Sequence, residues 1–261
     1  MNKLTTLEFE RRDDVAVVHL NRPDAANGFN LQMASELADV AHACDADPSV
    51  RAVLLTGRGK FFSAGGDVKT MVSLGKEAGP GVKLIADALH RAISTFRRMR
   101  APLVVAVNGT CAGAGFSLAL AGDLVIAASS AKFTMAYTGI GLTPDGGASY
   151  FLPRLVGLRR AQELMFTNRT LSSGEALEWG LLTSVSADDQ LQTDALTAAT
   201  KLANGSLNAH GRVKELLLEA FDNHLETQME KEGRLIAAAL ATPDGQEGVR
   251  AFAEKRKPQF G

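Results

Sequence analysis

The sequence contains little cysteine, no excess of either charge and no internal repeat. Its two cysteines, Cys44 and Cys111, stand far apart, and there is no Cys-x-x-Cys pair and no histidine cluster. This usage excludes a disulfide scaffold and a zinc site, and it favours a cytoplasmic protein with reduced thiols and no bound metal. The 28 basic and 29 acidic residues leave a net charge of −1, so the basic field of a nucleic-acid-binding protein is absent.

Long apolar segments are also scarce. The first residues, MNKLTTLEFERRDD, include no apolar core of a signal peptide, so we expect none. The longest uncharged stretch, Ala101 to Gly122, is long enough to suggest a membrane span. Pro102, Asn108 and several glycines interrupt it, however. We therefore interpret it as a strand, a turn and a buried helix, and we expect no association with a membrane.

The composition and the apolar pattern predict one globular α/β protein. Apolar residues make up 46% of the 261 residues, and charged residues 22%. Continuous apolar strands are predicted at 15–20, 50–56, 103–107 and 123–127, with helices at 31–44 and 83–99. Such strands between helices predict a mostly parallel sheet with both faces covered. Further helices are expected near 158–167, 172–179, 188–203, 206–221, 223–241 and 244–255. The predicted organisation is a core at 1–195 and a helical region at 196–261.

Two glycine-containing loops are the first candidate site. One spans 61–67, with the sequence FFSAGGD, and the other begins Gly113-Ala-Gly115 at the start of a short helix. Glycines allow tight turns that point backbone N–H groups into a cleft, and two such donors can hold an oxyanion. The second loop also partly matches a dinucleotide loop or a nucleophile elbow around Ser117, but Leu118 and Ala119 replace the required glycines. In a purely structural interpretation, the glycines only let the helix pack on the sheet.

Asp145 and His90 are the candidate acid–base side chains. Asp145 lies in the segment TPDGG at 143–147, which is a strong turn signal and so has a purely structural interpretation. The functional interpretation is a carboxylate in a partly dry pocket, acting as a base or a nucleophile. His90 lies off the apolar stripe of its helix, so a solvated side chain is expected unless a cleft adjoins it.

The motifs occur in a fixed order along almost the whole chain. They are LNRPD at 20–24, LLTGRGK at 54–60, FSAGGD at 62–67, VNG at 107–109, GAG at 113–115, LSSGEA at 171–176, EWG at 178–180 and KRKPQF at 255–260. This ordered set resembles the enoyl-CoA hydratase/isomerase (crotonase) superfamily. The resemblance implies a superhelical core of ββα units, a helical C-terminal trimerisation region, trimers or hexamers, and an acyl-CoA thioester substrate.

The resemblance also assigns roles to individual residues. It implies that the N–H groups of Ala64 and Ala114 hold the thioester enolate, that Asp145 shuttles a proton, and that coenzyme A enters only as part of the substrate. Contacts with the CoA thioester are implied for Asp24, Ala25, Ala26, Ala64, Gly65, Gly66, Asp67, Val68, Gly113, Ala114 and Tyr137, and for Lys257 and Phe260 of a neighbouring subunit. The segment 68–82 is expected to be a loop that lines the acyl pocket.

The departures from the family pattern favour one branch of it. The two glutamates with which hydratases add water are replaced here by Ser117 and Tyr137, so ordinary hydration is not expected. The Pro-Asp-Gly-Gly segment is similar to the isomerase branch, including the ring-opening isomerases of phenylacetyl-CoA breakdown.

The residues also permit chemistries besides isomerisation. The segment 158–170 resembles chlorobenzoyl-CoA dehalogenases, with His90 as base and Asp145 as nucleophile. The aromatic cradle of those enzymes is mostly missing, because the corresponding positions are Ala64, Val82, Leu89 and Tyr137. Thioester hydrolysis by the same pair of residues stays open, as does a catalytically weak CoA-binding or assembly protein. A serine hydrolase built on Ser117 is the most distant candidate.

Overall fold

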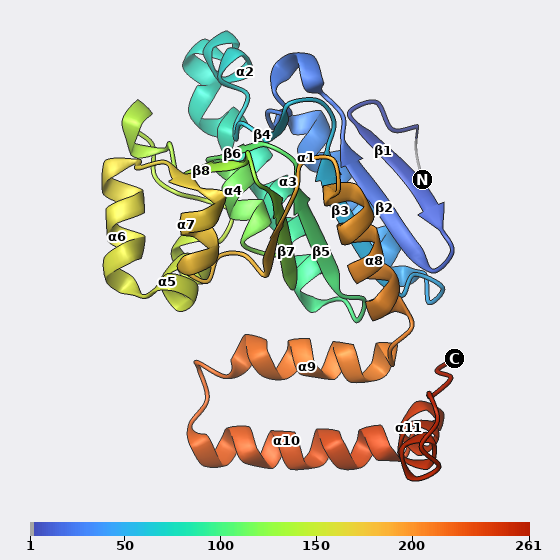
Figure 1. The fold of residues 1–261 in the computed structure, drawn as a ribbon. Coiled ribbons are helices and arrows are strands. Elements are labelled where there is room, and N and C mark those ends of the chain that lie inside the picture. Colours follow the sequence, from blue (N-terminus) through green and yellow to red (C-terminus); the bar gives the residue numbers. More distant parts are fainter. Residues whose placement is uncertain (1–2) are drawn as a thin grey trace.

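A computed structural model describes residues 3–261 and shows two β-sheets surrounded by helices (Figure 1). The larger sheet has the strand order β1-β2-β3-β5-β7-β10, with β1 antiparallel to β2 and the other neighbours parallel. Its strands are β1 (Leu7–Arg12), β2 (Val15–Leu20), β3 (Ala52–Gly57), β5 (Leu103–Val107), β7 (Leu124–Ala128) and β10 (Ser184–Ser186). The four strands predicted from apolar runs are therefore confirmed.

Strands β2, β3 and β5 are buried along their whole length. Helix α8 packs on β3 and β5, and α1 packs along α3. In Figure 1, α8 lies in front of the sheet and α1 and α3 lie behind it. Both faces of these strands are covered, so their side chains are buried whichever way they point. This explains why the strands are continuous apolar runs and do not alternate between apolar and polar residues.

The smaller sheet brings the two glycine loops together. It consists of β4 (Phe61–Ser63), β6 (Thr110–Ala112), β8 (Lys132–Thr134) and β9 (Leu171–Ser172), in that order. Each of β3, β5 and β7 is followed directly by one of these short strands, which gives the expected ββα repeats. Because β4 and β6 pair in parallel, the loops that follow them leave the sheet side by side.

The helices largely follow the predicted positions. They are α1 (Leu31–Ala46), α2 (Val68–Ser73), α3 (Ala78–Arg98), α4 (Ala114–Ala119), α5 (Ala148–Val156), α6 (Leu158–Thr167), α7 (Ser173–Glu178), α8 (Leu191–Ala203), α9 (Leu207–Glu219), α10 (Leu225–Leu240) and α11 (Pro243–Ala253). The segment 68–82 is not a loop, because α2, a 3-10 turn and the start of α3 occupy it. Pro80 is compatible with this helix because it lies in the first turn, where a missing N–H costs no helical hydrogen bond.

The uncharged stretch 101–122 forms β5, a turn, β6 and the buried helix α4, as expected. Among residues 3–261, no helix is both long enough and apolar enough to cross a bilayer.

Helices α9, α10 and α11 lie below the rest of the molecule in Figure 1. The boundary expected at 195 falls inside α8, which packs on the sheet, so the outlying helices begin at α9. Helix α9 is anchored by the buried Lys214, whose Nζ lies 2.7 Å from Asp123 Oδ2 and donates to Phe96 O at 2.7 Å.

The outlying helices expose a large apolar surface. Their apolar side chains that are more than half exposed are Val213, Leu217, Phe221, Leu225, Met229, Ile236, Leu240, Val249 and Phe252. A surface of this kind is typical of a contact between proteins. Trimer or hexamer formation stays a prediction.

Glu36 ties Thr5 and Thr6 to α1, and it makes stability depend on pH. Its carboxylate, in a residue 5% exposed, accepts hydrogen bonds from the N–H and hydroxyl groups of Thr5 and Thr6 and from Gln32. Burial alone would raise the pKa of Glu36, but the hydrogen bonds outweigh it and lower the pKa from 4.5 to about 2. The stabilisation is therefore complete above pH 4.5 and is lost as the pH falls towards 2.

We expect Glu36→Gln to lower the free energy of unfolding by roughly 3 kcal/mol at pH 7 and by about half of that at pH 3. Urea unfolding of both proteins at the two pH values measures the difference. An equal loss at both pH values would contradict the role of the charge.

Candidate active site

A mostly apolar cavity of about 280 Å³ lies where the two glycine loops meet α3. Phe29, Gly66, Ala114, Tyr137 and Asp145 line it, so it gathers candidates from separate parts of the sequence. Its other lining residues are Met71, Gly79, Val82, Lys83, Ile85, Ala86, Leu89, Leu142 and Thr143. The segment 68–82 therefore contributes to the wall, as expected, although it is helical.

The first free backbone donor at the cavity is the N–H of Gly66. Phe29 forms a parallel bridge with Gly66, in which Phe29 N donates to Gly65 O at 2.7 Å and Asp67 N donates to Phe29 O at 2.9 Å. The Gly65–Gly66 peptide is planar and trans, so the Gly66 N–H points opposite to the Gly65 carbonyl and away from Phe29. Within the described part of the chain this N–H has no hydrogen-bond acceptor.

The structure argues against Ala64 as an oxyanion donor. Its N–H donates to Ala26 O at 2.9 Å, and Ala64 does not line the cavity. The donor position therefore moves to Gly66, which the family resemblance placed only among the CoA contacts. No sequence signal distinguishes the two residues, because the choice depends on the bridge between Gly66 and Phe29.

The second free donor is the N–H of Ala114, the first residue of α4, where the helix supplies no acceptor. Gly113 before it has φ 51° and ψ −128°, a conformation that favours glycine. A Cβ on Gly65 would lie 3.2 Å from both Ala114 N and Gly113 Cα, so the two loops are in direct contact. Two N–H donors thus open on one cavity.

Asp145 stands at the end of a buried hydrogen-bonded chain. Tyr137 Oη lies 2.6 Å from Asp145 Oδ1, and Ser117 Oγ lies 3.0 Å from Tyr137 Oη. Burial and the negative charge of Asp145 raise the pKa of Tyr137, so the phenol keeps its proton. Tyr137 therefore donates to Asp145, and Ser117 donates to Tyr137.

Ser117 has no basic partner to make it a nucleophile. Its side chain is fully buried, and within residues 3–261 its oxygen forms hydrogen bonds only with Tyr137 and the Gly113 carbonyl. A serine hydrolase requires a histidine within hydrogen-bond reach of this hydroxyl, and none is among its hydrogen bonds in residues 3–261. The structure therefore gives the serine-hydrolase hypothesis no support.

His90 lies beside Asp145 but outside the apolar cavity. Its Nε2 accepts a hydrogen bond from Gly146 N at 3.0 Å and lies 3.8 Å from Asp145 Oδ2. In this geometry Nε2 serves as a hydrogen-bond acceptor for the backbone. His90 and Gly146 line a separate cavity of about 300 Å³ on the other side of the Asp145 turn. In this geometry His90 holds the turn that carries Asp145.

The residues implied in CoA binding lie in three different parts of the structure. Asp24 and Ala25 form a 3-10 turn next to Ala26, on the same side of the molecule as the 61–67 loop. Asp67 is not free to bind a ligand, because its carboxylate caps α2 and pairs with Arg22, while Val68 begins α2 and is exposed. Lys257 and Phe260 follow α11, which lies below the core in Figure 1, so they stay predictions for a neighbouring subunit.

Clusters of metal-ligating side chains and activated thiols are both absent from the described residues. No group of three or more His, Cys, Asp or Glu side chains in 3–261 is arranged to hold a metal ion. Cys44 and Cys111 are both buried and unpaired, and burial raises the pKa of the Cys44 thiol to about 12. Neither thiol is therefore activated as a nucleophile.

Comparison with known proteins places the chain among acyl-CoA enzymes. A family model described as enoyl-CoA hydratase/isomerase matches residues 10–261. The chain is 38% identical over 250 residues to 1,2-epoxyphenylacetyl-CoA isomerase of Escherichia coli (strain K12), covering 94% of each protein. It is 37% identical over 259 residues to a probable enoyl-CoA hydratase of Mycobacterium tuberculosis, covering 98% of this chain and 97% of the relative.

Solved structures of enoyl-CoA hydratases have the same fold as this chain. An enoyl-CoA hydratase from Polaromonas sp. JS666 superposes with a TM-score of 0.94 at 33% identity, over 98% of this chain and 99% of that one. This similarity confirms the expected fold class, an α/β core of ββα units followed by C-terminal helices. The relatives carry both hydratase and isomerase names.

Proposed function

Because this chain belongs to the enoyl-CoA hydratase/isomerase family, we propose that it shifts a double bond within an acyl-CoA thioester by moving one proton through Asp145. One observation carries this proposal. Asp145 is the single carboxylate among the described residues that line the cavity, and two free N–H donors open on the same cavity. One carboxylate suffices to move a proton between carbons, whereas adding water by the family's route uses a pair.

The two N–H groups of Gly66 and Ala114 hold the thioester oxygen. When Asp145 takes a proton from the α-carbon of a 3-enoyl thioester, the C–H bond breaks and an O–H bond forms on the carboxyl. The electron pair moves onto the thioester oxygen, where the two donors stabilise the negative charge. The same proton then returns to the γ-carbon, and the electrons form the conjugated 2-enoyl product with no change in mass.

The hydrogen bond from Tyr137 gives the two carboxylate oxygens of Asp145 different roles. Its hydroxyl occupies Asp145 Oδ1 at 2.6 Å, so Oδ2 is the oxygen that takes and returns the proton. Tyr137 is 9% exposed and Ser117 supports it from behind, so the carboxylate has little freedom to turn. Proton transfer from the α-carbon to the γ-carbon requires a base that is held in a fixed position near both.

We expect Tyr137→Phe to lower kcat by about 10- to 100-fold, because a hydrogen bond to a charged group contributes about 1.5–3 kcal/mol. Steady-state kinetics on a 3-enoyl-CoA measures the loss. Ser117→Ala is the matched control, since it keeps the bond between Tyr137 and Asp145, and it should change kcat by less than about fivefold. Unchanged turnover in Tyr137→Phe would show that the phenol does not orient the base.

A second candidate is hydrolysis or dehalogenation, in which Asp145 attacks as a nucleophile and His90 activates water. The distance of 3.8 Å between His90 Nε2 and Asp145 Oδ2 favours it. Against it, Nε2 already accepts the Gly146 N–H, and His90 does not line the apolar cavity. A covalent acyl-Asp145 adduct found by mass spectrometry during turnover would support this candidate over isomerisation.

A substrate panel decides between these reactions. The protein is incubated with 2-enoyl-, 3-enoyl- and aryl-CoA esters, and absorbance and product mass are followed together. Growth of the conjugated enoyl absorbance from a 3-enoyl-CoA, without a mass change, supports the isomerase. A gain of water, or release of free coenzyme A or halide, would replace it with hydration, hydrolysis or dehalogenation.

We also propose that the chain forms trimers or hexamers through α9, α10 and α11. The exposed apolar side chains of these helices support this, since α9 has only one of its residues buried and α10 has none. In such an assembly Lys257 and Phe260 could reach the site of a neighbouring subunit. Sedimentation velocity measures the assembly state, and a monomer at micromolar concentration would contradict the proposal.

A further inference from the structure

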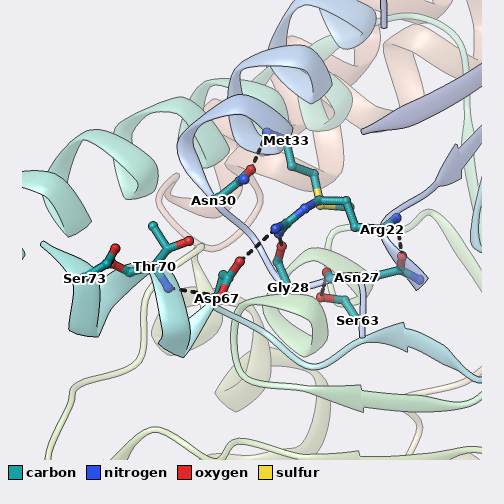
Figure 2. A network of polar contacts seen from close by, with 9 residues as sticks. All are labelled: Arg22, Asn27, Gly28, Asn30, Met33, Ser63, Asp67, Thr70 and Ser73. Atoms are coloured by element: carbon teal, nitrogen blue, oxygen red, sulfur yellow. Dashed lines mark hydrogen bonds and ion pairs between the residues drawn. The ribbon is translucent and has the colours of Figure 1, made fainter. Parts of the chain in front are cut away.

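Arg22 lies at the centre of a polar network next to the Gly66 loop (Figure 2). Its side chain is 19% exposed, and that of its partner Asp67 is 10% exposed. Nη2 donates to Asp67 Oδ2 at 2.8 Å, and Nη1 donates to the carbonyl oxygen of Gly28. One guanidinium therefore bridges the segment of Gly28 and that of Asp67, which lies 45 residues after Arg22 in the chain.

The two acceptors of Arg22 lie on either side of the bridge that directs the Gly66 N–H. Gly28 immediately precedes Phe29, whose N–H holds the Gly65 carbonyl. Asp67 immediately follows Gly66, and its own N–H donates to Phe29 O. Since the Gly65 carbonyl fixes the plane of the Gly65–Gly66 peptide, anything that holds these two segments in register also fixes where the Gly66 N–H points.

Asp67 extends the connection to α2 and to the cavity wall. Its Oδ1 accepts from Thr70 N at 3.2 Å, which caps α2. Helix α2 carries Met71, which lines the cavity and packs over the Cα of Gly66. Burial opposes the charge of Asp67, but the hydrogen bonds from Arg22 and Thr70 prevail and lower its pKa, so the clamp is an ion pair.

We propose that Arg22 and Asp67 form a clamp that positions the Gly66 N–H for the thioester oxygen. This inference rests on the proposed function, in which Gly66 is one of the two oxyanion donors. Arg22 is thus a positioning residue, and it acts through the backbone of Gly66 without touching the substrate. A lysine cannot replace it, because a single ammonium does not present the planar fork that reaches both acceptors.

The loop itself does not depend on the Arg22 side chain. Asn27 holds it independently, since its side chain accepts from Arg22 N at 2.8 Å and donates to Arg58 O at 2.9 Å and to Phe61 O at 2.8 Å. Ser63 Oγ in turn donates to Asn27 O at 2.8 Å. We therefore expect a variant of the Arg22 side chain to keep the fold but no longer to fix the direction of the Gly66 N–H.

The experiment uses a 2,4-dienoyl-CoA, whose absorption moves to longer wavelength when donors polarise its carbonyl. All variants carry Asp145→Asn as well, so that the probe is not turned over. We expect Arg22→Met to lose at least about half of the red shift at saturation while its Kd changes less than about threefold. With Asp145 intact, Arg22→Met should lower kcat about tenfold and leave KM nearly unchanged.

Two further variants complete the design. Arg58→Met is the matched control, because Arg58 pairs with Glu8 and its side chain touches neither Gly28 nor Asp67, so its red shift and kcat should match the wild type. Arg22→Lys keeps the positive charge and should still lose most of the red shift, and it serves as the second variant if Arg22→Met unfolds.

The outcomes separate the clamp from the proposed function. A full red shift and undiminished kcat in Arg22→Met or Arg22→Lys would overturn the clamp and leave the isomerase intact. Absence of any red shift in the Asp145→Asn protein with Arg22 present would overturn the role of Gly66 and Ala114, and the clamp with it. An equal loss in Arg58→Met would also overturn the clamp, since the effect would then not be specific to Arg22.

Discussion

Asp145→Asn is expected to lower kcat for isomerisation by at least about 10³-fold while the acyl-CoA still binds, because general-base catalysis contributes about 10²–10⁴ and no other carboxylate reaches the cavity among the residues described. Asparagine has the same shape as aspartate, and its amide oxygen can still accept the hydrogen bond from Tyr137. The amide nitrogen then replaces Oδ2, which leaves no group to take the proton.

Conversion of a 3-enoyl-CoA to the conjugated isomer measures this loss, and incorporation of deuterium at the α-carbon from D₂O reports the proton-abstraction step alone. Asp39→Asn is the control, because Asp39 is an exposed carboxylate on α1 and does not line the cavity. It should leave turnover unchanged. If Asp145→Asn kept wild-type turnover on every accepted substrate, the proton shuttle would have to be another residue.

Ala114→Pro is expected to lower kcat by about 10²–10³-fold, the usual effect of losing one oxyanion donor. Ala114 is the first residue of α4, so the missing N–H breaks no helical hydrogen bond. Gly113 already has φ 51° and ψ −128°, the mirror image of the extended conformation that suits a residue before proline. The substitution therefore removes the donor and leaves the fold in place.

Ala114→Gly is the matched control, because it shortens the side chain and keeps the N–H. Its turnover should stay close to that of the wild type. Kinetics and thermal unfolding of both variants are compared, so that a loss of fold is recognised separately. Turnover of Ala114→Pro within about tenfold of the wild type would mean that this N–H does not stabilise the enolate.

The sequence predicts the central sheet well because burial there is complete. Strands such as 103–107 are covered on both faces, and a continuous apolar run is the signature of that environment. The short strands β4 and β6 have only three residues each, which is too few for a period to emerge. They are nevertheless the elements that bring the two donor loops together.

The sequence predicts the wrong type of element around Gly79 and Pro80. Three glycines between 75 and 81 predict a loop, yet α3 begins at Ala78. Contacts with α2 and the amphipathic face of the rest of the helix outweigh the low helix propensity of those residues.

The donor assignment moves from Ala64 to Gly66 for a reason that lies in tertiary structure. The two residues are close together in a loop, and either could point an N–H into a cleft. The β-bridge with Phe29 leaves the Gly66 N–H free and directs it away from Phe29. The Ala64 N–H, in contrast, donates to Ala26 O. Both partners come from the segment before α1, so no local pattern around 61–67 reveals them. Asp145 is easier to locate, because the family resemblance already singles out its turn.

The chain of hydroxyls behind Asp145 also restricts how this active site can change in evolution. The family resemblance implies that Ser117 corresponds to the first glutamate of the hydratases, and its side chain is fully buried against Tyr137. A single Ser117→Glu step would bring a second negative charge into the Tyr137–Asp145 pair before any partner existed to share it. A glutamate at position 137 would in turn remove the phenol that donates to Asp145 Oδ1. In the proposed mechanism the hydrogen-bonded chain therefore couples positions 117 and 137, so a change to a pair of glutamates requires both substitutions together.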